Sequence, residues 1–382
     1  VNKVGLGIDN EYQSAAYSPI YKYNVNYKTN DNEGFFEFDK VDYNPAVYAQ
    51  PATTLVHVAQ MNNVVSNYSF HHVDTTMTAR GLSSKGDNKY ALNDVVSSDV
   101  NTNNPLHLEP DNAGVWFKPY VTFENMGLKN GPKVNGVTYG AMIGYDSKPI
   151  SMKNGMDGVV SGYIGYNGSN MHYSGNDINS NGGLLGATYS LYKGDFFNAT
   201  TVAVGMSGDQ IKTQYGTDTT GTFYTAVGNK TGYNIKFKDG LFVLQPSLLL
   251  SYTMADTFNY TNSAGVRISS KPVHSMQISP GVKFYMNTES GWKPYIGVNM
   301  MWNLMGQTHA HADNVALPSM SIKPYVQYGI GIQKDMNDNF SAYLQAMVQN
   351  GGRNGVSLSS GMKYLFSNGV QPQKSHDIHK TL

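Results

Sequence analysis

Residues 291–302 read Gly-Trp-Lys-Pro-Tyr-Ile-Gly-Val-Asn-Met-Met-Trp, and their side chains separate into two classes at every second position. One face carries Trp292, Pro294, Ile296, Val298, Met300 and Trp302. The other carries Lys293, Tyr295, Gly297, Asn299 and Met301. Successive side chains of a strand point to opposite faces, so this stretch predicts a β-strand with one oily face and one mixed face.

Segments 240–254 and 321–333 share this alternation, with Gln, Ser, Gly, Tyr and an occasional Lys on the mixed face. A soluble β-sandwich would place charged residues on its solvent face, whereas a transmembrane barrel turns its polar face toward a wet lumen. The residues expected to face the lumen are Lys118, Tyr120, Lys293, Tyr295, Lys323, Tyr325 and Gln327. Those expected to face lipid include Phe242, Leu244, Leu248, Ile296, Val298, Val326, Ile330 and Tyr364.

The composition independently favours a barrel in a membrane. Asp, Glu, Lys and Arg make up 14% of the 382 residues, against about 25% in ordinary globular domains, while Gly reaches 40 and Tyr 28 residues. A formal net charge of zero argues against nucleic acid as a partner. The absence of Cys excludes disulfides and Cys-based metal or redox sites. The sequence contains no apolar run of about 18 residues, the length that would predict a transmembrane helix. A closed β-barrel is the other structure that can cross a bilayer.

Twelve segments are long enough to cross a bilayer as tilted strands, which need about 9–11 residues. They are 114–125, 137–147, 157–167, 182–192, 195–207, 222–237, 240–254, 273–286, 291–302, 321–333, 340–350 and 355–366. The connections alternate between short ones and the long 126–136, 168–181, 208–221, 255–272 and 303–320, with 351–354 as the exception. Long external loops, short periplasmic turns and an even strand count are typical of outer-membrane barrels. We therefore predict an all-β fold, a transmembrane antiparallel twelve-stranded β-barrel.

Pro246 and Pro280 oppose this interpretation, because each lies in the middle of a predicted strand and removes a ladder N–H. They lie at similar distances from the loop that joins their strands. We expect them to share one bulge at the same height.

Several short motifs together resemble a known family. They are Gly114-Val-Trp-Phe-Lys-Pro-Tyr120, Gly144-Tyr-Asp146, Leu244-Gln-Pro-Ser247, Trp292-Lys-Pro-Tyr295, Gly351-Gly-Arg-Asn354 and the closing Tyr364-Leu-Phe366. Their order over residues 112–366 is similar to the C-terminal β-barrel of autotransporters. The resemblance implies a type V secretion translocator in a Gram-negative-type outer membrane, which exports and anchors an N-terminal passenger such as an adhesin.

The resemblance also implies insertion by the barrel-assembly machinery, which reads the last strand. The signal residues here would be Gly361, Tyr364 and Phe366. The family usually ends on that aromatic residue, whereas Ser367–Leu382 follow here. We expect this tail to be periplasmic and the loops to be exposed at the cell surface.

Residues 45–79 predict a helix, with Asn44 as a candidate cap and Pro45 in the first turn. The helix would be longer than the ~30 Å hydrocarbon thickness and is almost uncharged, so we expect it to thread the lumen, as the linker helix of the family does. The alternative is a periplasmic or surface helix. In the lumen its amides need partners on the wall. The helix residues concerned are Gln60, Asn62, Asn63 and Asn67, and the expected wall partners are Lys118, Tyr120, Lys293 or Tyr325.

The remaining segments complete the expected domain organisation. Residues 18–43 predict two short strands around 30–34 that resemble the end of a β-rich passenger. The stretch 80–112 is rich in Asn, Ser and Asp and predicts a linker. The expected parts are the passenger end 1–43, the linker helix 44–80, the polar linker 81–112, the barrel 113–366 and the tail 367–382.

Few residues suggest chemistry. His309 and His311 with Asp313 have metal-ligand spacing, but such a pattern in a long polar loop is more often solvated, and His71-His72 and His376 with His379 are weaker candidates. Asn62-Asn63 resembles the pair at which some autotransporters cut themselves by asparagine cyclisation, but the chain is rich in Asn and we expect an uncleaved linker. The sequence does not indicate a specific Ser-His or acid-His pair of the kind that a hydrolase active site needs. We expect no enzyme, no metal and no cofactor.

Aromatic residues near strand ends predict two interfacial girdles, made by Tyr145, Tyr252, Trp292, Trp302 and Tyr364. The expected partners are outer-membrane lipid and lipopolysaccharide, the barrel-assembly machinery and the chain's own passenger. The alternative function is an independent porin or surface protein that uses residues 1–112 as a plug or arm. The side of the membrane on which Val1 lies discriminates between the two functions.

Overall fold

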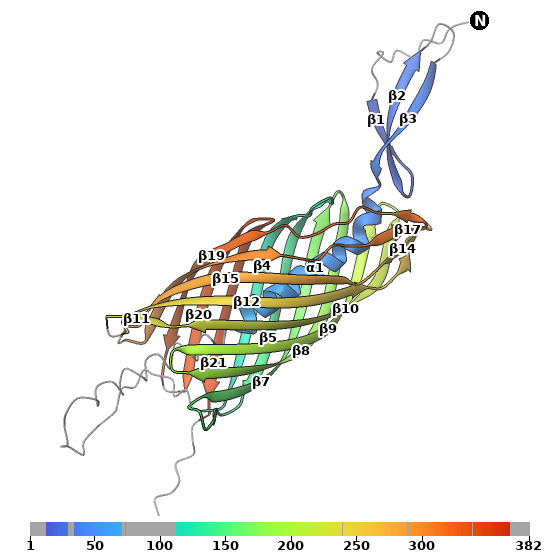
Figure 1. Cartoon of the computed structure of the whole chain (residues 1–382). Helices are drawn as coiled ribbons and strands as arrows, with labels where there is room; N and C mark the ends of the chain where they lie inside the picture. The colour runs from blue at the N-terminus through green and yellow to red at the C-terminus, as the bar shows by residue number, and fades with distance from the viewer. Residues whose placement is uncertain are drawn as a thin grey trace, which may run out of the picture.

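The computed structural model describes residues 13–29, 34–70, 73, 112–238, 240–288, 290–337 and 339–366. They form a small sheet, a helix that continues from it, and a large barrel that surrounds the helix (Figure 1). Residues 81–111 and 367–382, expected as linker and tail, lie outside the described residues.

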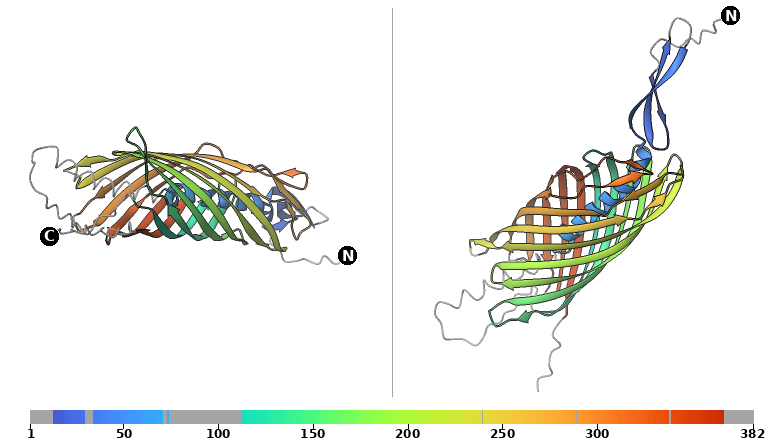
Figure 2. Two further views of the ribbon diagram at one scale, coloured as in Figure 1. Left: turned by 90° about the horizontal axis from the view of Figure 1, so that it is seen from below. Right: turned by 45° about the vertical axis from the view of Figure 1, so that its right-hand side comes forward.

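Twelve antiparallel strands close the barrel, so the predicted fold class is confirmed. They are β4 (Gly114–Gly127), β5 (Lys133–Asp146), β7 (Asp157–Tyr173), β8 (Asn176–Lys193), β9 (Phe196–Thr213), β10 (Gly216–Tyr233), β12 (Phe242–Thr257), β15 (Val273–Met286), β16 (Trp292–Asn303), β19 (Tyr325–Asp335), β20 (Phe340–Gly351) and β21 (Arg353–Leu365). Each strand pairs with the next one along the chain, and β21 pairs with β4 to complete the ring. The strands are steeply tilted (Figure 2).

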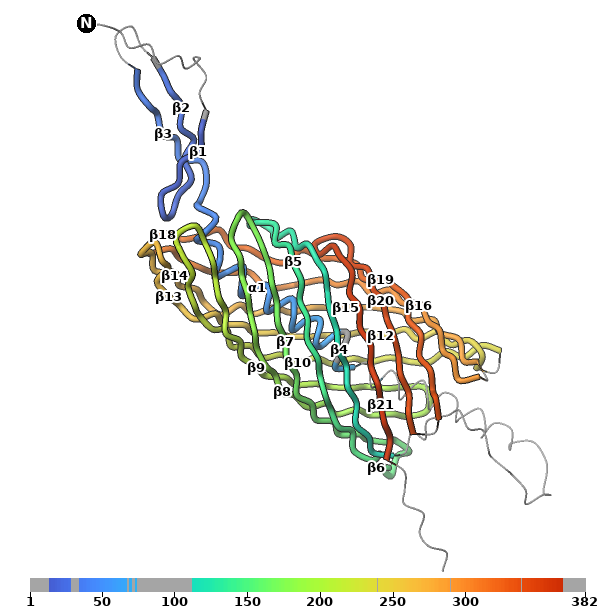
Figure 3. The backbone as a smooth tube through the Cα atoms, turned by 180° about the vertical axis from the view of Figure 1, so that it is seen from behind, coloured from blue at the N-terminus to red at the C-terminus, as the bar shows by residue number. Residues whose placement is uncertain are grey.

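Shorter elements lie at the two ends of the barrel. They are β6 (Ile150–Ser151), β11 (Ile235–Phe237) and a four-stranded sheet of β13 (Tyr260–Thr261), β14 (Arg267–Ser270), β17 (Ala310–Ala312) and β18 (Val315–Ala316). Outside the barrel, β1 (Gln13–Tyr17), β2 (Tyr21–Thr29) and β3 (Gly34–Tyr43) form a three-stranded sheet, where the sequence predicted two strands (Figure 3). We call the end of the barrel beside this sheet the upper end, and the end where β4 begins and β21 ends the lower end.

The sequence predicted the long connections after β12 and β16 correctly, but it predicted two other long loops wrongly. The segments 168–181 and 208–221, expected as long loops, are strand residues of β7 to β10 apart from two-residue turns. Ser174 and Gly175 make the first turn with positive φ angles of 45° and 78°, as a tight hairpin turn requires. Asn, Ser and Thr read as loop residues in sequence, but here they continue the hydrogen-bonded ladders beyond the apolar band.

The two faces of the barrel wall follow the parity of the sequence. Leu248, Ile296, Val298, Ile330 and Tyr364 are exposed on the outer face. Phe242, Leu244 and Val326 share this face and are partly exposed. Residues of the opposite parity, such as Gln245, Tyr295 and Gln327, are buried inside the barrel. The outer surface is therefore apolar over the span of these strands.

Pro246 and Pro280 do not share a bulge, which corrects the sequence prediction. The β12–β15 ladder runs through both prolines without a register shift, pairing Pro246 with Val282 and Leu248 with Pro280. Pro246 lies where β12 changes partner, because its pairs with β10 end at Ser247 and its pairs with β11 begin at Leu244. Pro280 lies in a gap of the β15–β16 ladder. Each missing N–H therefore falls where a neighbouring ladder is already interrupted.

Glycines face large aromatic rings on adjacent strands of the inner wall. A Cβ at Gly331 would lie 2.1 Å from Cζ of Tyr295, and a Cβ at Gly361 would lie 2.1 Å from Cε1 of Tyr343. Since real Cβ atoms do not approach so closely, these rings occupy the space that only glycine leaves free.

We expect Gly331→Val to lower the free energy of unfolding by about 1–3 kcal/mol, because the new side chain overlaps the Tyr295 ring. That ring is held in place by its hydroxyl, which donates to Oε1 of Gln345 at 2.7 Å. Urea unfolding of the purified barrel in micelles measures the change. Gly162→Val is the matched control, because nothing lies within 4 Å of the position that a Cβ would take there, on the outer face of β7. Equal losses for the two variants would contradict the steric explanation.

Candidate functional site

The candidate functional site is the lumen, which is filled by a helical segment over the upper part of its length. A 3₁₀ turn (Pro45–Tyr48) leads into α1 (Ala49–Asn63), and a π-helical turn (Val64–Tyr68) follows. Every residue of α1 is buried, although many of them are polar. The helix lies inside the ring of strands in all views (Figures 1 to 3). Among the described residues, no helix combines the length and the hydropathy needed to cross a membrane.

The helix is capped where it enters the barrel at the upper end. Asn44 Oδ1 accepts from the backbone N–H of Ala46 at 3.0 Å, as the sequence predicted for a cap residue. Its Nδ2 donates to the Ser18 carbonyl at 2.7 Å and to the Tyr215 hydroxyl at 2.8 Å. Asn44 therefore ties together the outer sheet, the start of the helix and the β9–β10 hairpin.

The four-stranded sheet β13–β14–β17–β18 covers the start of the helical segment at the upper end of the barrel. Its apolar side packs on Val47 at the start of the helical segment. The Tyr43 hydroxyl of β3 donates to the Ala316 carbonyl at 3.3 Å. Burial among these residues raises the pKa of the Tyr260 hydroxyl, so this group stays neutral. The two longest loops therefore close around the point where the helix enters.

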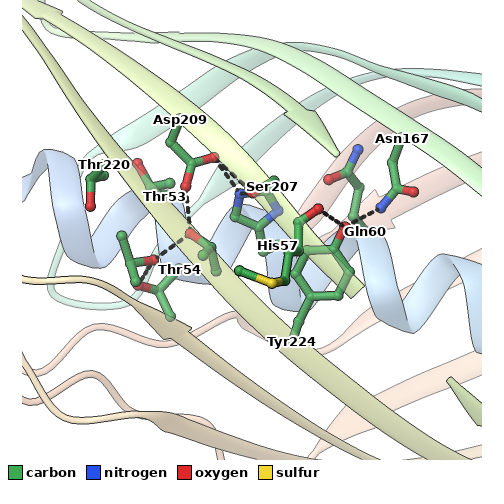
Figure 4. Close-up of polar contacts among 12 residues, drawn as sticks. Thr53, Thr54, His57, Gln60, Asn167, Ser207, Asp209, Thr220 and Tyr224 are labelled. Carbon is green, nitrogen blue, oxygen red and sulfur yellow. Dashed lines mark hydrogen bonds and ion pairs between the residues drawn. The ribbon is translucent and has the colours of Figure 1, made fainter. Parts of the chain in front are cut away.

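The middle of α1 is held by a buried cluster of polar side chains (Figure 4). His57 Nε2 lies 2.8 Å from Oδ1 of Asp209, and the Ser207 hydroxyl donates to the same oxygen at 3.0 Å. The Tyr224 ring stacks on the imidazole, with 5.5 Å between ring centroids. Because Asp209 belongs to the long strand β9, this cluster attaches one face of the helix to the inner wall of the barrel.

The cluster continues along the same wall, from β9 to β10 and β12, through threonine hydroxyls. Thr54 Oγ1 donates to Oγ1 of Thr257 at 2.7 Å, and Thr257 and Thr222 Oγ1 atoms are 2.9 Å apart. The Thr222 hydroxyl donates to Oδ2 of Asp209 at 2.5 Å. These hydroxyl groups therefore connect Thr54 of the helix to Asp209 of the wall by direct hydrogen bonds.

The lower part of α1 is held by Arg353, a residue of the Gly351–Asn354 motif for which the sequence predicted no contact with the helix. Arg353 donates from Nε and Nη2 to the two carboxylate oxygens of Glu124 at 2.6 and 2.7 Å. Its Nη1 donates to the Ala59 carbonyl at 3.3 Å, to Oδ1 of Asn63 at 3.1 Å and to the Tyr325 hydroxyl at 3.1 Å. Both charged side chains are only 1% exposed. One residue of the last strand therefore binds both the first strand and the helix.

Gln60 and Asn63 bond to partners other than those expected from sequence. Gln60 Nε2 donates to the Gly168 carbonyl at 2.9 Å, and Asn63 bonds Arg353. Asn62 accepts from the Thr253 hydroxyl at 3.1 Å. Asn67 belongs to the π-helical turn, but its side chain lies outside the described residues. From the expected set, Tyr325 joins this network, because its hydroxyl accepts from Arg353.

The wall residues expected to face the lumen divide into two groups. Six of them are buried: Lys118, Tyr120, Lys293, Tyr295, Tyr325 and Gln327. Lys293 forms an ion pair with Asp335 rather than with the helix, because β19 extends to Asp335, a residue that the sequence assigned to a turn. The prediction that Lys323 faces the lumen is wrong. Its side chain is exposed, since β19 begins only after Pro324.

The aromatic residues expected in girdles are all exposed on the outer surface: Tyr145, Tyr252, Trp292, Trp302 and Tyr364. Trp292 lies at the lower end of β16 and Trp302 near its upper end. At the lower end, Phe366 packs against Tyr364 and Tyr145, with ring centroids 6.0 and 6.4 Å away. Lys363 on β21 also forms an ion pair with Asp146 on β5, 2.9 Å away. These contacts cross the junction between the last and first strands.

Ser207, His57 and Asp209 do not have the geometry of a catalytic triad. Ser207 and Asp209 both approach Nε2 of His57, at 3.0 and 2.8 Å, whereas a triad uses the two ring nitrogens for different partners. His309, His311 and Asp313 are exposed, and Asp313 accepts from the Arg267 N–H. Within the described part of the chain, no group of three or more His, Cys, Asp or Glu residues is arranged to hold a metal ion. His71, His72, His376 and His379 lie outside the described residues.

A family model described as the autotransporter beta-domain matches residues 115–346. The chain belongs to the autotransporter β-domain family. Its barrel is therefore that of an outer-membrane protein, and it exports and anchors a passenger as this family does. A search of curated proteins found no match to the sequence.

Solved structures of autotransporter translocators share the fold. The β-domain of Bordetella BrkA is 18% identical, with a TM-score of 0.54, and the match covers 67% of this chain and 100% of BrkA's. The translocator domain of Neisseria meningitidis NalP is 12% identical, with a TM-score of 0.57 and coverage of 80% and 99%. The transport unit of Escherichia coli AIDA-I is 13% identical, with a TM-score of 0.56 and coverage of 76% and 99%.

Proposed function

We propose that the autotransporter barrel carries its passenger on the upper side, which faces the cell exterior, and holds it there through the helix in the lumen. The observation that carries this proposal is the continuous path from β3 through Asn44 into α1, with wall contacts along the helix. Residues 45–68 are about 36 Å long if helical, which is comparable to the thickness of a bilayer core. In this proposal residues 1–43 are the end of the passenger.

The outer surface supports this orientation in the membrane. Exposed tryptophan and tyrosine residues lie near both ends of the strands, where the two interfacial girdles would be. An even number of strands places the start of β4 and the end of β21 at the same end, which would be periplasmic. The passenger then reaches the surface only through the pore. The tail after Phe366 remains on the periplasmic side.

The proposed partners follow from the apolar outer face of the barrel and from its last strand, β21. The apolar outer face contacts outer-membrane lipid and, on the cell-surface side, lipopolysaccharide. The last strand, with Gly361, Tyr364 and Phe366, is the segment that the barrel-assembly machinery would recognise. The role of the protein is mechanical, and the lumen contacts described above serve to hold the helix.

The proposal predicts the positions of the two chain termini. An epitope placed before Val1 should bind antibody on intact cells, and external trypsin should remove it. The same epitope placed after Leu382 is the control, and it should become accessible only when the outer membrane is permeabilised. If the N-terminal epitope is protected in intact cells, the export function is wrong and a porin with a periplasmic arm is favoured.

A further inference from the structure

A cleft of ≈ 580 Å³ lies at the upper rim, where the loop 304–324 leaves β16 and returns to β19. Lys129, His274, His309 and Lys323 contribute to its lining, and no Asp or Glu does. All four side chains are exposed. The whole chain has equal numbers of acidic and basic residues, so this cleft is a local excess of positive charge.

The walls of the cleft are held together by backbone hydrogen bonds. The Lys129 N–H donates to the Ser321 carbonyl at 2.9 Å, and the Ser321 N–H donates back to Lys129 at 3.3 Å. The Gly352 N–H donates to the Pro324 carbonyl at 2.9 Å, beside Lys323. The two lysines therefore extend from a fixed frame, which reduces the entropy lost when they bind an anion.

The cleft is basic and apolar at the same time. Leu304 and Met305 line it and are 58% and 51% exposed. His274 lies on the outer face of β15, where its Nδ1 is 2.6 Å from the Tyr252 hydroxyl. Asp256 lies two residues beyond Met254, the register partner of His274, and does not line the cleft. A free anion would need only the charges, whereas a lipid presents a phosphate beside apolar chains.

We propose that this cleft binds a phosphate group on the headgroup of an outer-leaflet lipid. Lys129 and Lys323 would contact the phosphate as point charges, with the apolar residues against the adjoining lipid. The choice of lipid as the source rests on the proposed function, which places the upper rim at the outer leaflet. The binding itself is a property of the folded barrel and can be measured apart from export.

The test uses the full chain, purified in neutral micelles, with a diphosphorylated lipid A as the probe. Native mass spectrometry measures the fraction of lipid-bound protein. Lys129→Gln with Lys323→Gln is expected to weaken binding at least about tenfold, because two charge-assisted contacts are lost. The matched control is Lys153→Gln with Lys193→Gln, which removes the same charge from exposed positions at the lower end. The control variant should bind like the unmodified protein.

Two further probes separate the sources of phosphate. The same lipid without phosphate groups should bind at least about tenfold more weakly to the unmodified protein, and inorganic phosphate alone should compete only weakly. Equal binding of the lipid without phosphate, or equal losses in the two double variants, would overturn the site. Inorganic phosphate binding as tightly as the lipid would overturn the lipid source. None of these outcomes depends on whether a passenger reaches the cell surface.

Discussion

Replacing Arg353 by methionine is expected to lower the free energy of unfolding of the barrel by about 3–5 kcal/mol. The substitution keeps much of the aliphatic volume but leaves the Glu124 carboxylate buried without its cation. It also removes the donor that binds Ala59 and Asn63, so the lower end of the helix loses its link to the last strand. Urea unfolding in micelles, followed by tryptophan fluorescence, measures the loss.

The double variant Arg353→Met with Glu124→Met is the decisive control for this prediction. A buried ion pair replaced by two apolar residues often costs little, because neither charge is then left unpaired. We expect the double variant to recover most of the stability that the single variant loses. If both variants lose the same amount, the cost comes from the contacts to the helix and not from the buried carboxylate.

Deleting residues 45–70 should raise the single-channel conductance of the barrel several-fold. An α-helix with its side chains is about 10–12 Å wide, and in this barrel its side chains are buried against the wall over the whole of α1. Removing it leaves a lumen lined by polar side chains that water and ions can fill. Planar bilayer recordings of the refolded protein measure the change. Deletion of residues 1–43 is the control, since it removes the outer sheet and leaves the helix in place.

The full-length chain offers a second measurement of the same prediction. The sequence contains no Cys, so a single introduced thiol is the only one that can react. Cysteines at Val58 and Val65, which are 1% and 0% exposed, should react slowly with a bulky impermeant reagent. A cysteine at the exposed Lys153 should react quickly. Unchanged conductance on deletion, together with fast labelling at positions 58 and 65, would contradict a filled lumen.

Much of the barrel could be predicted from the sequence because strand faces depend on local parity. The stretch 291–302 separates into an oily and a mixed face, and the structure exposes Ile296 and Val298 while it buries Lys293. The number of strands followed from the same periodicity. The start of the helical segment could be predicted from Asn44 and Pro45. Asn44 caps it and Pro45 lies in its first turn, as these residue types favour.

The ends of the strands were less predictable, because a strand continues for as long as its neighbour offers ladder partners. The polar segments 168–181 and 208–221 read as loops but pair along most of their length, since β7 to β10 support one another. Lys323 shows the opposite case. Pro324 precedes the first ladder pair of β19 at Tyr325, so Lys323 is left on the exposed rim.

The sequence by itself determined which residues face inward, but only the tertiary structure decided which of them meet. Arg353 and Glu124 are 229 residues apart, and His57 and Asp209 are 152 apart, so no local pattern pairs them. Their contacts depend on the closing register between β21 and β4 and on the depth at which α1 sits in the barrel. A buried charge needs a partner at hydrogen-bond distance, and only the closed barrel brings strands from the two ends of the domain, together with the helix, to the same point.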